Sequence, residues 1–221
     1  MIKLSKRLET IVSLIPKSIV ADVGSDHGKL MISLFERSII EKGYAIENKK
    51  GPYERLCNNL KAYNAIDTVV PLLSDGISEL PECVNTVVLA GMGGSLIINI
   101  LCKHPDKLRN VETIIVDAHS CLSKVRSSIV ELGYSIAQEC IVKDANKFYE
   151  IIKFVKSDKA IYSDADYDFG PILRQEKSTT FKEKYSNRIK EIDNILSNNK
   201  DIPTKRVESL NKEKERINKI I

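Results

Sequence analysis

The stretch VADVGSDHGKL, Val20–Leu30, decides how the chain folds. A short apolar run leads directly into DVGSDHG (22–28), where three titratable side chains and two glycines follow one another. Glycine lets the backbone turn tightly and lets a ligand approach it closely. In an open α/β sheet, ligands bind beyond the carboxyl ends of the strands, usually at the first strand-to-helix turn. The stretch therefore predicts a ligand-binding turn, with an ordinary acidic turn as the alternative.

The two carboxylates of this turn, Asp22 and Asp26, indicate the chemistry of the ligand. A dinucleotide-binding turn reads Gly-x-Gly-x-x-Gly and holds a pyrophosphate. Here Asp26 replaces the middle glycine, and two carboxylates would repel a pyrophosphate. They suit a cationic head, such as the ammonium of a methionyl group. The pattern, which begins with Asp22 and Gly24, therefore favours S-adenosylmethionine over a nicotinamide dinucleotide.

Apolar runs alternate with helical patterns through the first 155 residues, as a sheet covered on both faces requires. The predicted strands are 18–24, 43–47, 69–74, 86–91, 113–118, 134–140 and 149–155. Residues 50–63 and 122–133 have apolar side chains at helical spacing. This order predicts an α/β fold with a Rossmann-like, mostly parallel sheet. The last two strands lack a helix-length gap, which predicts an antiparallel hairpin at one sheet edge.

Acids also end the next predicted strands. Glu47 ends the second, where a carboxylate can accept both hydroxyls of an adenosine ribose. Asp75 follows the third and is placed to accept from the adenine amine. AGMGG (90–94) ends the fourth, where glycines allow cofactor and substrate to approach. A single acid here is usually a cap or turn residue, but three in succession favour a cofactor site.

The pattern changes after residue 173. Apolar residues at coiled-coil-like spacing are Phe181, Tyr185, Ile189, Ile192 and Leu196, and then Val207, Leu210, Ile217 and Ile220. NNKDIP (198–203) predicts a turn between two helices, with Pro203 starting the second. We expect an antiparallel helical, coiled-coil hairpin.

This C-terminal part also holds the positive charge. Residues 174–221 contain 13 Lys and Arg against 8 Asp and Glu, which leaves 21 against 22 in the rest of the chain. Such asymmetry indicates an anionic partner such as nucleic acid. A solvated helical surface is the alternative.

The absence of two motifs reduces the range of atoms to which a methyl group could be transferred. No Asn/Asp-Pro-Pro-aromatic motif, which is usual for methylation of the adenine amine, follows the fourth predicted strand. Cys102 and Cys121 lack the context of a cytosine-C5 nucleophile. A ring nitrogen such as adenine N1 offers an in-plane lone pair and needs only alignment and stabilisation of a cationic product.

The cysteine content and the lack of membrane or secretion signals indicate where the protein is found. Five single cysteines, an odd number without a Cys-x-x-Cys pair, indicate reduced thiols and no zinc site. The sequence has no run of about 18 apolar residues and no secretory signal. We expect a cytoplasmic protein with no metal and no membrane partner, and a monomer.

The sequence resembles the bacterial tRNA (adenine-N1)-methyltransferases that modify adenosine 22. The resemblance is carried by LSKRLETIVSLIP, ADVGSDHGKL, GYAIENKKGPYERLCNNL, LLSDG, AGMGG and FGPIL, in the family's order. It implies a class I methyltransferase fold, with residues 1–160 as catalytic domain and 161–221 as a tRNA-binding hairpin. VDAHS (116–120) departs from the Gln-Pro-Asn expected there.

The resemblance also implies roles for single residues. Those expected at the cofactor are Asp22, Gly24, Ser25, Glu47, Asp75, Gly76, Gly91 and Met92. Asp26 and His27 would face the target base as candidate catalytic residues, although His27 could instead only order the loop. The basic residues expected to bind tRNA are Lys182, Lys184, Arg188 and Lys190. Two rival functions stay open: a small-molecule methyltransferase that dimerises through the hairpin, and a non-catalytic RNA-binding protein.

Overall fold

The computed structural model describes residues 1–157, 161–198 and 202–221. The chain divides into two units, Met1–Ile161 and Tyr162–Ile221. Within the described ranges, no helix is long and apolar enough to cross a membrane.

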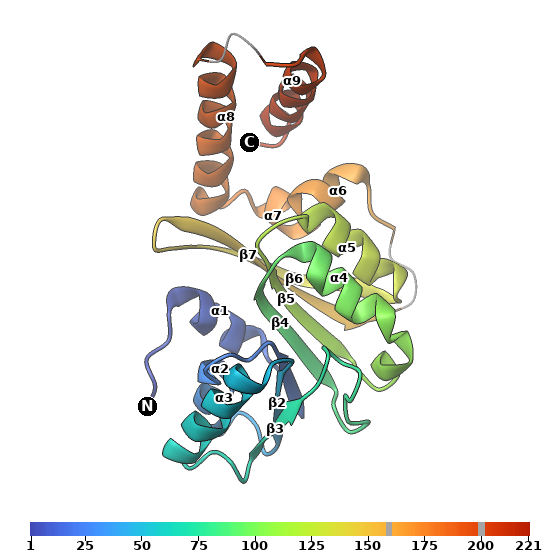
Figure 1. Cartoon of the computed structure of the whole chain (residues 1–221). Helices are drawn as coiled ribbons and strands as arrows, with labels where there is room; N and C mark the ends of the chain where they lie inside the picture. Colours follow the sequence, from blue (N-terminus) through green and yellow to red (C-terminus); the bar gives the residue numbers. More distant parts are fainter. Residues whose placement is uncertain (158–160, 199–201) are drawn as a thin grey trace. The chain divides into compact units, whose positions relative to one another are not determined.

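The first unit is built on a sheet whose described strands number seven, in the order β3-β2-β1-β4-β5-β7-β6 (Figure 1). They are β1 (Val20–Val23), β2 (Gly43–Glu47), β3 (Val69–Leu73), β4 (Thr86–Met92), β5 (Thr113–Ala118), β6 (Tyr134–Asp144) and β7 (Lys147–Lys156). Strands β1 to β5 run parallel, whereas β7 pairs antiparallel with both β5 and β6. The predicted parallel sheet and its antiparallel edge hairpin are confirmed. Because the order reverses at β1, a crevice opens at the carboxyl ends of β1 and β4.

Helices cover both faces of this sheet, which is the physical reason that its strands read as apolar runs. The described helices are α1 (Lys6–Leu14), α2 (Lys29–Glu36), α3 (Lys50–Ala62), α4 (Gly94–Lys103), the short 3-10 helix η1 (Pro105–Leu108) and α5 (Leu122–Glu131). Helices α1 to α3 lie on one side and α4 and α5 on the other (Figure 1). Ile11, Leu34 and Leu56 of the first group join Val20 and Val88 in one buried core.

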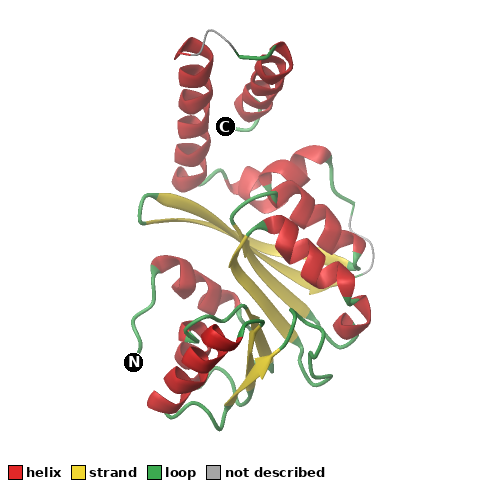
Figure 2. Cartoon of the chain, viewed as in Figure 1, coloured by secondary structure: helices red, strands yellow, loops and turns green. Residues whose placement is uncertain are grey.

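The second unit is helical (Figure 2). Its described helices are α6 (Asp164–Phe169), α7 (Pro171–Glu176), α8 (Thr179–Asn198) and α9 (Thr204–Asn218). Helices α8 and α9 run in opposite directions, as the predicted hairpin requires (Figure 1). Pro203 is the residue before α9, as predicted, while 199–201 of the predicted turn lie outside the described residues.

The predicted apolar stripe packs this hairpin. The fully or nearly buried members are Phe181, Tyr185, Ile192, Leu210, Ile217 and Ile220. The other predicted members, Ile189, Leu196 and Val207, are only partly buried. An ion pair adds to the packing, because Arg188 Nε and Nη2 donate to the two carboxylate oxygens of Glu213 at 2.7 and 3.0 Å.

Candidate functional site

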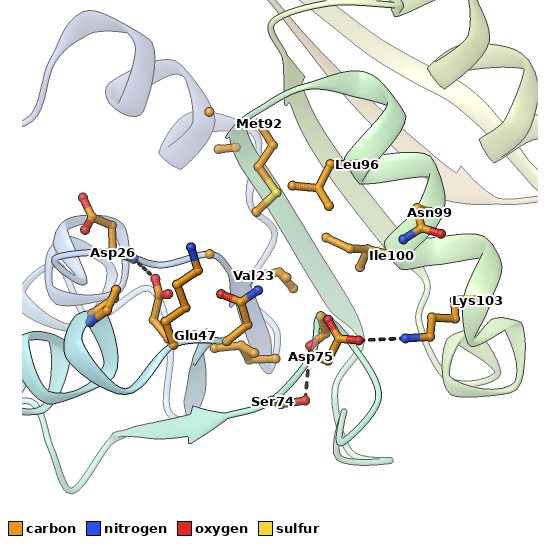
Figure 3. Close-up of a pocket in the computed structure, with 18 of the residues that line it drawn as sticks. Val23, Asp26, Glu47, Ser74, Asp75, Met92, Leu96, Asn99, Ile100 and Lys103 are labelled. Atoms are coloured by element: carbon orange, nitrogen blue, oxygen red, sulfur yellow. Dashed lines mark hydrogen bonds and ion pairs between the residues drawn. The ribbon is translucent and has the colours of Figure 1, made fainter.

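The carboxyl ends of the parallel strands surround a cavity of about 350 Å³ (Figure 3). Its walls come from the turns after β1, β2, β3 and β4 and from one face of α4. Predicted cofactor residues in these walls are Gly24, Glu47, Asp75, Gly76, Gly91 and Met92, together with Asp26. Residues from four separate turns thus meet in one cavity.

The turn after β1 is fixed by backbone and side-chain hydrogen bonds. The amides of Gly24 and Ser25 donate to Ile46 O on β2, at 2.9 and 3.1 Å. Gly24 and Gly28 have φ of +73° and +70°, a region that favours glycine, and Gly28 is followed directly by α2. The predicted need for glycine at both positions is therefore confirmed.

Asp22 is a buried carboxylate at this turn. Asp22 is 4% exposed, and Ser25 Oγ donates to its Oδ2 at 2.7 Å. Burial raises the pKa of Asp22 to about 6; the Ser25 hydrogen bond opposes this, and the Glu47 charge adds to it. A cation bound beside such a buried carboxylate stabilises its ionised form.

Glu47 ends β2 and is also buried. One of its carboxylate oxygens accepts the backbone N–H of Asp26 (Figure 3). Asp26 has φ +51°, an unusual value for a residue with a side chain, so this hydrogen bond helps to hold the turn. Glu47 therefore joins the second strand end to the first, and its second oxygen can accept from a ligand hydroxyl.

Asp75 lies at the far end of the cavity and is exposed. Its carboxylate pairs with Lys103 Nζ of α4 at 2.7 Å (Figure 3). This hydrogen bond lowers the pKa of Asp75 below its ordinary value. Gly76 has φ +61°, and a Cβ there would lie 2.9 Å from Ile100 of α4. Glycine is thus required for this turn to pack against α4.

The end of β4, Ala90 to Met92, forms the wall of the cavity between these turns, here called the roof. Gly91 has φ +78°, and the register of β4 against β5 shifts between Ala90 and Met92. Met92 points into the cavity (Figure 3), and its Cε lies where a Cβ on Gly24 would be only 2.4 Å away. The Met92 side chain therefore covers the backbone of the turn after β1.

A second cavity of about 410 Å³ shares walls with the first. The shared residues are Gly24, Asp26, Ala90 and Gly91. Asp22, Ser25 and His27 line only the second cavity, so the structure divides the predicted cofactor residues between two adjoining spaces. His27 Nε2 lies 3.6 Å from the Asp26 carboxylate, and both side chains are largely exposed.

Sequence reasoning missed several wall residues. The cavity face of α4 presents Leu96, Asn99, Ile100 and Lys103, which recur at helical spacing directly after AGMGG. That spacing was a signal that could have found them. Arg7 of α1 lines the second cavity and pairs with Asp117 at the end of β5. Nothing in the spacing of these two residues, 110 positions apart, indicates their contact.

The four predicted tRNA-binding residues lie on α8, in the second unit. Lys182 and Lys190 are exposed. Lys184 Nζ lies 5.1 Å from the centre of the Tyr185 ring. Arg188 is bound to Glu213 and Glu191, so its charge is already neutralised within the hairpin.

A parallel sheet of this order, with an antiparallel last strand and acids around a cavity at its switch point, defines the Rossmann-like class I methyltransferases. Within the described residues, His, Cys, Asp and Glu form no group of three or more that could hold a metal ion.

The family model described as tRNA (adenine(22)-N(1))-methyltransferase matches residues 20–221, so this chain belongs to that family. A curated relative, the tRNA (adenine(22)-N(1))-methyltransferase of Bacillus subtilis (strain 168), is 27% identical over 205 residues, covering 88% of this chain and 84% of the relative.

Solved structures are similar over nearly the whole chain. A proposed tRNA (m1A22) methyltransferase from Streptococcus pneumoniae, in complex with S-adenosyl-L-methionine, has a TM-score of 0.90 at 31% identity and covers 99% of each chain. The B. subtilis m1A22 tRNA methyltransferase has a TM-score of 0.89 at 25% identity and covers 100% of each. The resemblance of the sequence to this family is thereby confirmed.

Proposed function

We propose that this chain transfers a methyl group from S-adenosylmethionine to N1 of adenine 22 in tRNA. Family membership supports the reaction. The observation that carries it to these residues is the pair of adjoining cavities, which share Gly24, Asp26, Ala90 and Gly91. S-adenosylmethionine supplies a methyl group on a sulfonium, and its transfer leaves the S–C electron pair on sulfur and passes the positive charge to the acceptor.

The acceptors of the first cavity, together with Asp22 and Ser25 of the adjoining cavity, fit this cofactor. Buried Asp22 would accept from the methionyl ammonium across the Gly24 turn, where both charge and burial favour a cation. Glu47 would accept from the ribose hydroxyls with the oxygen not used by Asp26. Asp75 would accept from the adenine amine, and its Lys103 partner can move because both side chains are exposed. Ser25, Gly76, Gly91 and Met92 would complete the walls.

The part of the second cavity beyond Asp22 and Ser25 would hold the target base. Neutral adenine has no proton on N1, so the chain needs no general base and must instead align the ring edge and stabilise a growing positive charge. Asp26 stands at the boundary of the two cavities and can supply that negative charge. His27, 3.6 Å from Asp26, would contact the base or hold the Asp26 side chain in place.

The helical hairpin would bind the phosphates of tRNA, because the C-terminal part of the chain carries the positive excess. Lys182 and Lys190 are suited to this by their exposure. Lys184 would contribute as well, while Arg188 would act chiefly by holding α8 and α9 together. Such contacts position the RNA without reading its sequence. We assign the protein to the cytoplasm, where tRNA is modified, and to a monomeric state.

The direct test is mass-spectrometric nucleoside analysis of tRNA after incubation with the protein and S-adenosylmethionine. We expect 1-methyladenosine in a tRNA with adenosine at position 22, and none when that position carries guanosine. An Asp26→Asn variant should bind the cofactor normally and react more slowly. Methylation of a different nucleotide, or of none, would contradict the proposal.

A further inference from the structure

Arg7 of α1 forms one wall of the second cavity, and three neighbours hold its guanidinium there. Nη1 donates to Asp117 Oδ2 at 2.5 Å. The guanidinium carbon lies 5.4 Å from the centre of the Tyr149 ring. A Cβ on Gly91 would lie 3.2 Å from Nη1, so the guanidinium sits directly on the roof that the two cavities share.

Asp117 has no contact with solvent. Its side chain is 0% exposed, and it stands at the end of β5, opposite Ala90 of β4. Its second oxygen, Oδ1, is buried without a hydrogen-bond partner among the described residues. A lone buried carboxylate is costly, and such groups in proteins are usually paired with a cation. A buried carboxylate therefore stands behind Arg7.

We propose that Arg7 is a wall against which the target base is placed, and that Asp117 is a positioning residue that acts through Arg7 by fixing its guanidinium and cancelling its charge. This inference rests on the proposed function. It goes beyond it by naming what controls the electrostatics of the acceptor side.

Charge balance gives the reason. Methylation turns a neutral adenine ring into a cation, so an uncompensated guanidinium beside the base would oppose the transition state. Arginine is nevertheless a good wall for a base, because its planar group can stack on rings, and Arg7 already makes a cation–π contact with Tyr149. Pairing with buried Asp117 lets the site keep the shape of arginine without its net charge.

The test is a double-mutant cycle with Arg7→Gln and Asp117→Asn, read as single-turnover rates at saturating tRNA and cofactor. Asp117→Asn removes the ion pair of Arg7 and leaves the weaker coulombic attraction of Asp22, so most of the Arg7 charge is uncompensated. A unit charge about 6–10 Å from the reacting atoms, at an effective dielectric constant of about 20, slows the reaction roughly 10- to 100-fold. Adding Arg7→Gln removes that charge, so the double variant should be faster than Asp117→Asn by a comparable factor.

A purely structural ion pair would behave in the opposite way. Each further substitution would then slow the reaction or leave it unchanged, and a double variant no faster than Asp117→Asn would overturn the inference. Cofactor affinity is measured by calorimetry for every variant, because Arg7 also acts electrostatically on Asp22, and rates are compared at saturating cofactor so that a change in affinity does not enter them. Arg7→Lys, which keeps the charge but loses the planar group, should retain charge cancellation and lose alignment, raising KM for tRNA.

Two controls complete the design. Glu9→Gln removes a different ion pair of α1, the one in which Arg37 donates to both Glu9 oxygens at 2.8 and 2.7 Å, and should leave the rate unchanged. Melting temperatures identify any variant that fails to fold. Arg7→Gln alone leaves Asp117 as a buried carboxylate without a cation and could unfold for that reason. The double variant buries no unpaired charge and keeps the test available. If wild-type protein makes no 1-methyladenosine, the proposed function itself fails. If the wild-type protein is active but the double variant is no faster than Asp117→Asn, only this inference fails.

Discussion

Lowering the pH from 7.5 to 5.0 should weaken cofactor binding through one residue, Asp22. Its pKa is raised to about 6 by burial, so it is almost fully ionised at pH 7.5 and about one-tenth ionised at pH 5.0. The methionyl ammonium, with an α-amino pKa of about 7.7–8.0, stays mostly protonated up to pH 7.5. If only the ionised carboxylate accepts the ammonium, affinity should fall roughly tenfold, which is about 1.4 kcal/mol.

The assay is isothermal titration calorimetry from pH 5 to 7.5, in buffers with different ionisation enthalpies. Affinity should rise with pH up to about 6 and then level off, and binding at pH 5 should release close to one proton, because the bound cation lowers the pKa of Asp22. Ser25→Ala removes the hydrogen bond that opposes the raised pKa, so the midpoint should move upward. Asp67→Asn, an exposed acid away from the cavity walls, is the matched control and should change nothing.

Two results would refute this reasoning. The first is an affinity that stays constant between pH 5 and 7 in the wild-type protein. The second is an Asp22→Asn variant that keeps the wild-type dependence on pH, since the titrating group would then be another residue.

Three other predictions follow from the same geometry. Asp22→Asn should make the ligand-free protein more stable to urea at pH 7.5: a folded-state pKa raised from 3.8 to about 6 gives stability that is full below 3.8 and lost as pH rises through 6, at most about 3 kcal/mol. A variant that is less stable at pH 7.5 would contradict this. Asp75→Ala should weaken cofactor binding by about 1 kcal/mol and abolish any preference for adenine over hypoxanthine in competing nucleoside analogues; an unchanged preference would remove the assigned role. A chain ending at residue 161 should keep the cofactor affinity of the full chain in calorimetry and lose most of its tRNA affinity, together with the salt dependence, in filter binding. Normal tRNA binding by this truncated chain would leave the hairpin a packing element.

The sheet could be predicted from the sequence, and so could the meeting of the acids that line the proposed cofactor site. Continuous apolar runs can be buried only in a sheet covered on both faces, and Gly24 and Gly28 adopt positive φ that other residues resist. Acids that end successive parallel strands are bound to meet, because those ends share one edge. Asp22, Glu47 and Asp75 could thus be placed near one ligand before any side chain was positioned. The hairpin was equally readable, since a stripe of apolar residues at helical spacing has to be covered.

The hydrogen-bond and ion-pair partners of these groups could not be predicted, because they depend on how the folded elements pack. Burial sets the pKa of Asp22, and packing brings Lys103 to Asp75. Packing also brings Glu213 to Arg188, so a residue predicted to bind tRNA phosphates instead forms an ion pair within the hairpin. Nothing in the sequence indicated that the predicted cofactor residues would line two adjoining cavities with Gly91 in both. Arg7 and Asp117 belong to no local pattern, because α1 reaches the end of β5 only after the sheet has assembled. Periodicity and turn chemistry are short-range properties of the chain, whereas charge pairing across 110 residues is fixed by the packing of the whole unit.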